Sequence, residues 1–238
     1  ITVTVATLAS QISASNYGNK IAYSAGGVTD WEIFYEKSDG RIFILSNTVV
    51  GAYSLPTSTL YSVSSTVTDL FMLTNPGVTY TTGYTLSSSY PNNKAASYLM
   101  NQSNWSTYIN TSYADYAIGG PTLQMFVASY NEKDGDPILN CSNKRANGIY
   151  LGIGTGSPTT LEDEGAAANY FVRNDNYWIT TPRGSPDNSY GMYNMNPHGS
   201  GIDGNYMPNW SFGVCPCVAL KSGIKGYWNG STWVLTGT

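Results

Sequence analysis

Short runs of aromatic and β-branched residues mark the first part of the chain. Residues 31–35 and 41–46 read WEIFY and RIFILS, and residues 37–40 between them end in Asp-Gly. An Asp-Gly pair between two such runs is typical of a β-hairpin turn. The pattern therefore predicts two paired strands, with residues 20–23 as a partner strand beside them.

The last part of the chain shows the same alternation of apolar runs and turns. Apolar residues over 212–220 and 232–235 flank a Tyr-Trp-Asn-Gly turn at 227–230, and another run lies at 148–153. Runs of this length bounded by turn residues favour strands over helices. We predict strands at these positions and expect the N- and C-terminal strands to lie close together.

Helical spacing is confined to the middle of the chain. Aromatic residues and leucine at 95–108 are spaced for a helix, and residues 112–118 can add a short one before the Gly-Gly-Pro breaker. Thr122 is a good N-cap for a second helix over 123–131, which the charged segment 132–137 closes.

The segment 173–206, named the variable window below, has a different composition. Of its 34 residues, 22 are Asn, Tyr, Asp, His, Ser or Gly. Tyr offers a large contact area with two torsions to freeze, and Ser, Asn and Gly offer adaptable hydrogen bonding, as in antibody paratopes. A segment so poor in aliphatic residues indicates a binding surface, held between apolar runs at 177–179 and 212–220.

Together these elements predict one α+β domain over residues 1–238. Short antiparallel strands would surround two helices, and residues 155–210 would be mostly an irregular loop. The 238 residues can build one well-buried core, and we find neither an internal repeat nor a dividing linker.

The low charge of the chain narrows its partners. Charged residues make up 11% of the sequence, against about 25% in ordinary soluble domains, so the surface is expected to be rich in Ser, Thr, Asn, Gly and Tyr. A net charge of −4 and eleven scattered Lys and Arg give no basic patch for a phosphate backbone. Nucleic acid is therefore not an expected partner.

The sequence gives few signs of a membrane-spanning segment or of disulfide bonds. No apolar run approaches the roughly 20 residues that span a bilayer, so direct membrane insertion of this segment is not expected. The chain begins at Ile1 without a signal peptide, which suits a protein whose N-terminal targeting segment is absent here. For Cys141, Cys215 and Cys217 we favour free thiols, while a bridge between Cys215 and Cys217 or a long-range bridge from Cys141 stays open.

The residue inventory argues against catalysis and metal binding. His198 is the only histidine and lies between polar, Gly-rich neighbours that would not orient it as a base. Glu162, Asp163 and Glu164 are contiguous, so they would not face one another across a sugar. Asp134 and Asp136 offer about half of the oxygen ligands that calcium needs. We therefore expect no enzymatic activity, no cofactor and no metal.

Four stretches of the chain carry a resemblance to a known family. They are residues 16–46, 112–133, 177–182 (YWITTP) and 212–226 (FGVCPCVALKSGIKG). They resemble a bacterial and phage-associated family of C-type-lectin-fold proteins that close on a Trp-Leu-x-Ser-Pro…Gly-Val-Arg-Pro signature. The chain also looks like members diversified by retroelements, in which copying errors at template adenines turn Asn codons mainly into Tyr, Asp, His, Ser, Gly, Thr and Ile. The resemblance implies a C-type-lectin-like fold and display on a phage tail or pilus-like fibre.

The signature is matched in part. The matching residues are Trp178, Pro182, Gly213, Val214 and Pro216. Ile179 and Thr181 replace the family's Leu and Ser, and Cys215 stands where Arg is usual. That change removes a cation that the family often uses to tie the variable loop to the scaffold, which leaves the anchor of the loop open. The tripeptides of calcium-dependent sugar binders do not occur, so calcium-dependent sugar recognition is disfavoured.

We therefore expect a surface-displayed ligand-binding protein, an adhesin or receptor-binding protein whose variable window meets a protein or glycan on another cell or particle. Its expected location is extracellular or at the cell surface. A pilin-like or phage-fibre subunit without a dedicated ligand remains the alternative. Tyr190, Tyr193, Tyr206, Arg173 and Arg183 are expected to carry most of the binding energy. The full set of expected ligand contacts is Arg173, Asn174, Asp175, Asn176, Tyr177, Arg183, Ser185, Asp187, Asn188, Tyr190, Met192, Tyr193, Asn194, Asn196, His198, Ser200, Asp203, Asn205 and Tyr206.

Exposed asparagines in the variable window should tolerate replacement. The six are Asn174, Asn176, Asn188, Asn194, Asn196 and Asn205. Each change to Ser or Tyr should alter the free energy of unfolding by no more than about 0.5 kcal/mol, whereas Trp178→Ala should cost about 3–5 kcal/mol. Denaturant titrations compare the variants, and asparagine changes as costly as Trp178→Ala would contradict the surface assignment.

Overall fold

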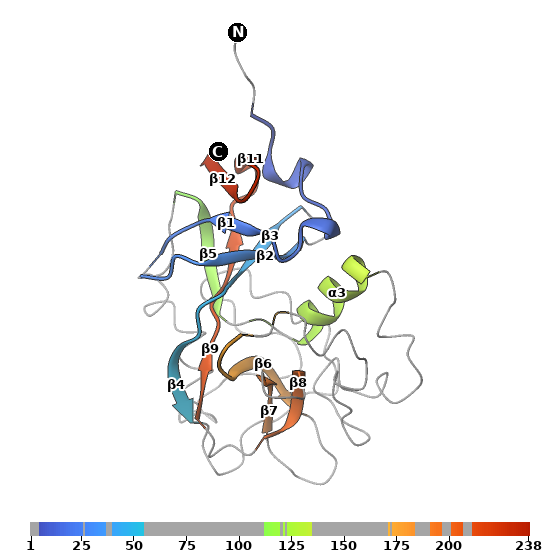
Figure 1. The fold of residues 1–238 in the computed structure, drawn as a ribbon, viewed down its shortest axis with the longest axis vertical. Helices are drawn as coiled ribbons and strands as arrows, with labels where there is room; N and C mark the ends of the chain where they lie inside the picture. Colours follow the sequence, from blue (N-terminus) through green and yellow to red (C-terminus); the bar gives the residue numbers. More distant parts are fainter. Residues whose placement is uncertain are drawn as a thin grey trace.

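Strands dominate the computed structural model, which describes residues 5–25, 27–36, 40–54, 112–119, 121, 123–134, 171, 173–183, 191–196, 201–206 and 211–238. In this part of the chain they form two sheets (Figure 1). The seven-stranded sheet has the order β11-β12-β1-β2-β3-β10-β5, and the five-stranded sheet has the order β4-β9-β6-β7-β8.

The seven-stranded sheet joins the two ends of the chain. Its members are β1 (Lys20–Ala22), β2 (Trp31–Glu36), β3 (Ile42–Ser46), β5 (Ala114–Gly119), β10 (Cys217–Leu220), β11 (Lys225–Trp228) and β12 (Trp233–Gly237). β1 pairs with β12 in parallel, Ile21 opposite Trp233. The strands predicted at 20–23, 31–35, 41–46 and 232–235 are therefore confirmed, and so is the closeness of the terminal strands.

The five-stranded sheet contains the variable window. Its members are β4 (Val50–Ser54), β6 (Tyr177–Arg183), β7 (Gly191–Asn196), β8 (Gly201–Tyr206) and β9 (Ser211–Val214). The prediction that residues 155–210 are mostly loop is therefore wrong for the described part of that range. Polar composition suggested a loop, but antiparallel pairing of β7 with both β6 and β8 supplies ladder partners that local sequence does not reveal.

The predicted fold class, α+β with two helices in a C-type-lectin-like arrangement, is wrong for the described residues. They contain one α-helix, α3 (Leu123–Asp134), besides two three-residue 3₁₀ turns at Leu8–Ser10 and Ala14–Asn16. The helix predicted at 123–131 is confirmed by α3. Residues 112–118 instead contribute to strand β5, because β10 offers them a ladder partner. The helix expected at 95–108 and the strand at 148–153 lie outside the described residues.

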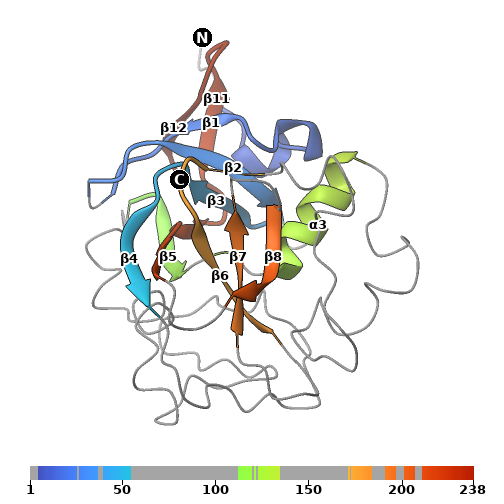
Figure 2. The ribbon, with the colours of Figure 1, turned by 60° about the horizontal axis from the view of Figure 1, so that its bottom comes forward.

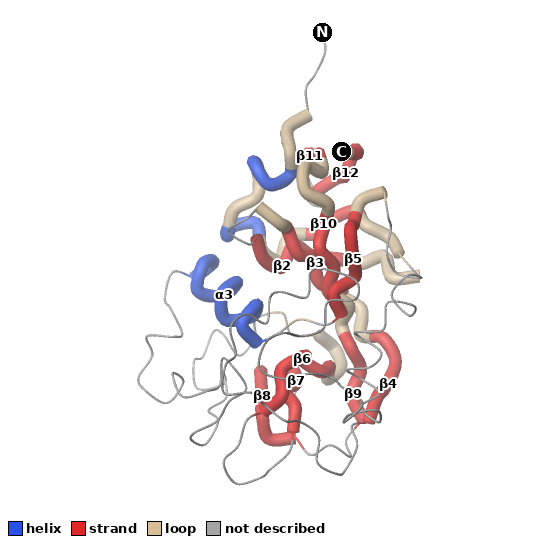
Figure 3. Tube along the Cα trace, turned by 180° about the vertical axis from the view of Figure 1, so that it is seen from behind, coloured by secondary structure: helices blue, strands red, loops and turns tan. Residues whose placement is uncertain are grey.

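Two chain segments run side by side through both sheets, and we call them the crossing ribbon. The first is β3 followed by β4, and the second is β9 followed by β10. β10 pairs with β3 in one sheet, whereas β9 pairs with β4 in the other. The strand predicted over 212–220 is thus two strands in different sheets. Figure 3 shows β4 and β9 continuing away from β3 and β10.

The bend of the crossing ribbon is closely packed. The Ser46 amide donates to the Pro216 carbonyl over 2.8 Å, and the Ser46 hydroxyl donates to the Thr48 carbonyl over 2.7 Å. A Cβ atom added to Gly213 would lie 2.1 Å from Val49 Cγ1 and 3.0 Å from the Gly51 carbonyl oxygen. Only glycine fits this close approach without displacing its neighbours.

Aromatic side chains fill the core between the sheets and α3. Phe34 on β2 meets Phe126 on α3 and Phe171 with ring centroids 4.9 Å apart in both pairs. Tyr177 and Ile179 of β6 belong to the same core. Trp178 packs against Phe212 at 4.6 Å and is fully buried, so β6 is covered on both faces at this point. With twelve residues, α3 is too short and too polar to cross a bilayer, and the described chain offers no better candidate.

Gly213→Ala tests the crossing ribbon. The added methyl group must displace Val49 or the β4 backbone, and overpacking of this kind costs about 1–3 kcal/mol of unfolding free energy. Urea titrations should show Gly213→Ala combined with Val49→Ala losing less than the sum of the single changes, because Val49→Ala removes the nearest obstructing carbon. Strict additivity of the two changes would contradict this packing.

Candidate functional site

The described strands of the variable window, β6, β7 and β8, pair in sequence order within the five-stranded sheet. β6 pairs with β7, Trp178 opposite Asn194, and β7 pairs with β8, Asn194 opposite Asp203. Both pairings contain a register irregularity, as polar strands with turn residues often do. Figure 2 shows β6, β7 and β8 side by side. The window thus has a regular backbone frame.

The expected ligand contacts fall into three groups in this frame. Ser185, Asp187, Asn188, Tyr190, His198 and Ser200 lie outside the described residues. Arg183, Met192, Tyr193, Asn194, Asn196, Asp203, Asn205 and Tyr206 occupy backbone positions on β6, β7 and β8. Met195 on β7, absent from the contact set, is buried.

The third group, at the start of the window, divides between surface and core. Asn174 and Asp175 are exposed, and Asn176 is half-buried. Arg173 is only 7% exposed and Tyr177 is fully buried. The expectation that these two side chains contact ligand is therefore corrected, because neither presents an accessible surface to a macromolecule.

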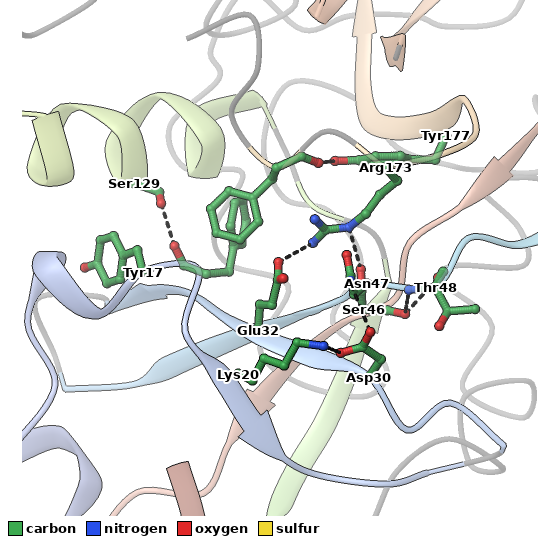
Figure 4. A network of polar contacts seen from close by, with 12 residues as sticks. Tyr17, Lys20, Asp30, Glu32, Ser46, Asn47, Thr48, Ser129, Arg173 and Tyr177 are labelled. Carbon is green, nitrogen blue, oxygen red and sulfur yellow. Dashed lines mark hydrogen bonds and ion pairs between the residues drawn. The ribbon is translucent and has the colours of Figure 1, made fainter. Parts of the chain in front are cut away.

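Arg173 lies against the bend of the crossing ribbon (Figure 4). Its Nη2 atom lies 3.0 Å from Glu32 Oε2 on β2, and its Nε donates to the Ser46 carbonyl over 3.2 Å. Glu32 keeps 15% of its side chain exposed. Removing one partner of so buried a pair typically costs about 3–5 kcal/mol, because the remaining charge loses its compensation.

A second contact set holds the backbone on either side of Arg173. Phe171 has a left-handed backbone, φ 56°, which costs an L residue roughly 1–2 kcal/mol. The Tyr177 hydroxyl donates to the Phe171 carbonyl over 2.9 Å, and the Arg173 guanidinium lies 5.4 Å from the centre of the Phe171 ring. The Tyr177 hydroxyl thus ties Phe171 to the start of β6, while Asn174 and Asp175 between them are exposed.

Arg173 also lies beside Cys215, between β9 and β10. Burial raises the pKa of the Cys215 thiol to about 12, although the charge of Arg173 and its hydrogen bond to the thiol act in the opposite direction. Cys215 is therefore a neutral thiol near pH 7. Cys215 and Cys217 are both free and buried, as favoured from the sequence. Cys141 lies outside the described residues.

A more exposed set of polar contacts continues from this site toward β1. Asp30 accepts hydrogen bonds from Asn47 Nδ2 over 2.9 Å and from Lys20 Nζ over 3.0 Å. Burial alone would raise the pKa of the Asp30 carboxyl, but these two donors outweigh burial and hold the pKa below its ordinary value of 3.8. Asp30 therefore links Asn47, at the bend of the crossing ribbon, to Lys20 on β1.

The sequence did not single out Glu32 and Ser46 as functional residues. Glu32 stands inside an apolar strand, WEIFYE, in a chain with few charges, and such an acid needs a buried cation as its partner. That signal could have indicated Glu32. Ser46 contributes its backbone carbonyl, for which composition gives no signal.

Comparisons with protein-family models, curated proteins and solved structures found no match. Within the described residues, no group of three or more His, Cys, Asp or Glu is placed to hold a metal ion.

The Asp30 contacts predict a pH-dependent contribution to stability. Because the folded pKa of Asp30 is lowered, its contribution is present above 3.8 and is lost as pH falls through the folded pKa. The unfolding free energy of the wild type should exceed that of Asp30→Asn at about pH 5–7, and the difference should shrink below about pH 4. Asp175→Asn, which removes an exposed carboxylate, is the control. A difference for Asp30→Asn that is constant down to about pH 2 would refute the assignment.

Proposed function

We propose that the protein is a surface-displayed ligand-binding protein and that the variable window is its binding site. The observation that carries this proposal is that some residues of the window are buried in the core and others are exposed. Arg173, Tyr177 to Ile179 and Met195 are buried, whereas Asn174 and Asp175 are exposed, and the sequence of β7 and β8 is mostly polar. A segment of this composition held in a sheet suits recognition by many weak, adaptable contacts.

The ligand in this proposal is a protein or glycan on another cell or particle, recognised without a metal, a cofactor or a chemical reaction. The low charge of the chain favours hydrogen bonding and aromatic contact over electrostatic steering. The protein would act outside the cell or at its surface, on a pilus-like fibre or a phage particle. The proposal includes diversification of the window by a retroelement, for which the Asn-, Tyr-, Asp-, Ser- and Gly-rich composition is the support.

Related copies of the gene in the source genome test the diversification. A retroelement would confine substitutions to the window and to codons with adenine in the template. Substitutions scattered evenly over strands of both sheets would favour a structural fibre subunit instead.

Exchange of the window should exchange the ligand. Residues 180–206 of a sibling copy, grafted behind the retained residues 171–179 and with Met195 kept, should switch the glycan or protein bound on an array. The melting temperature should change by no more than about 2 °C, because the buried support is kept. Binding that survives the graft, or that EDTA abolishes, would place the site elsewhere.

A further inference from the structure

We propose that Arg173 is a positioning residue that fixes the window's sheet on the scaffold, and that ligand contacts begin beyond Ile179. This inference rests on the proposed function of the window.

Three parts of the scaffold converge on the Arg173 guanidinium. Glu32 comes from β2, the Ser46 carbonyl comes from the end of β3, and Cys215 lies between β9 and β10. Two of these contacts flank the bend where the crossing ribbon passes from one sheet to the other. Four residues after Arg173, the chain begins β6 of the five-stranded sheet. Arg173 therefore connects the start of the window to both segments of the ribbon.

The contacts of the site suit arginine better than lysine. The planar guanidinium pairs with the Glu32 carboxylate by charge at 3.0 Å while its Nε donates to the Ser46 carbonyl and the group lies 5.4 Å from the centre of the Phe171 ring. A lysine ammonium is a point charge that cannot hold the same set of directions. The contact is also buried from solvent, which weakens screening by salt.

Contacts at the start of the window hold β6 in its sheet, which allows side chains further along the window to change. β6 pairs in parallel with β9 at Tyr177 and Trp178, and the Gly213 amide donates to the Asn176 carbonyl over 3.1 Å. These contacts use backbone atoms, Arg173 and buried aromatic residues, none of which depends on the identity of the residues after Ile179. Beyond that point Met195 also belongs to the core, so the inference concerns substitutions after Ile179 other than at Met195.

Backbone hydrogen exchange followed by mass spectrometry tests the proposal without a ligand. In Arg173→Met, exchange in peptides covering 177–183, 191–196 and 201–206 should accelerate about tenfold or more, while exchange over 225–237 should change less than about twofold. Arg173→Lys, which keeps the charge and loses the planar guanidinium, should accelerate exchange in the same peptides to an intermediate extent. Because no binding is measured, this result is separate from the outcome of the window graft.

Uniform acceleration over both sheets would show a general contribution to stability and would overturn the positioning role. Unchanged exchange in the window peptides would overturn it equally. If Arg173→Met does not fold, Glu32→Gln provides the second variant, since it keeps an oxygen acceptor and removes the charge. Its effect should again be confined to the window peptides, and acceleration at β11 and β12 as large as that at β6 to β8 would contradict the proposal.

Discussion

The bend of the crossing ribbon is the constraint on which the other features depend. Two segments must leave one sheet together, turn together and join a second sheet, and each loses its ladder partner if the other shifts. Gly213 permits the close approach, and the Pro216 carbonyl keeps the Ser46 amide paired at the turn. The relative position of the two sheets is therefore determined at a few residues, and Arg173 and Asp30 both attach to this place.

The window begins with buried core residues and continues with strands of polar composition. Its first residues bury an arginine and three consecutive core residues, whereas its strands β7 and β8 have few aliphatic residues. These polar strands are the part of the window that the proposed function assigns to ligand contact.

Sequence patterns predicted the elements whose stability is local. The runs at 31–35 and 41–46 pair as neighbours, and α3 follows directly from helical spacing after a capping residue. They failed for β5, which was predicted as a helix. β5 pairs with β10, about one hundred residues away in the chain, and this pairing overrides the helical spacing of its sequence. The window residues Arg173 and Tyr177 were misplaced for a related reason. The composition of a segment does not show which of its residues will meet a carboxylate in the folded chain, so it could not identify the buried pair of Arg173 and Glu32.

The described ends of the chain lie at the opposite pole from the window. Residues from Val5 to Leu8 run beside β11, next to the C-terminal strand β12, while β6, β7 and β8 occupy the far end of the molecule in Figure 1. A chain continued from either terminus would thus point away from the window. Several copies attached through that pole would present their windows in a common layer, and individually weak contacts would then act together through effective concentration. If the window binds ligand as proposed, copies joined at this pole would gain avidity from their proximity alone.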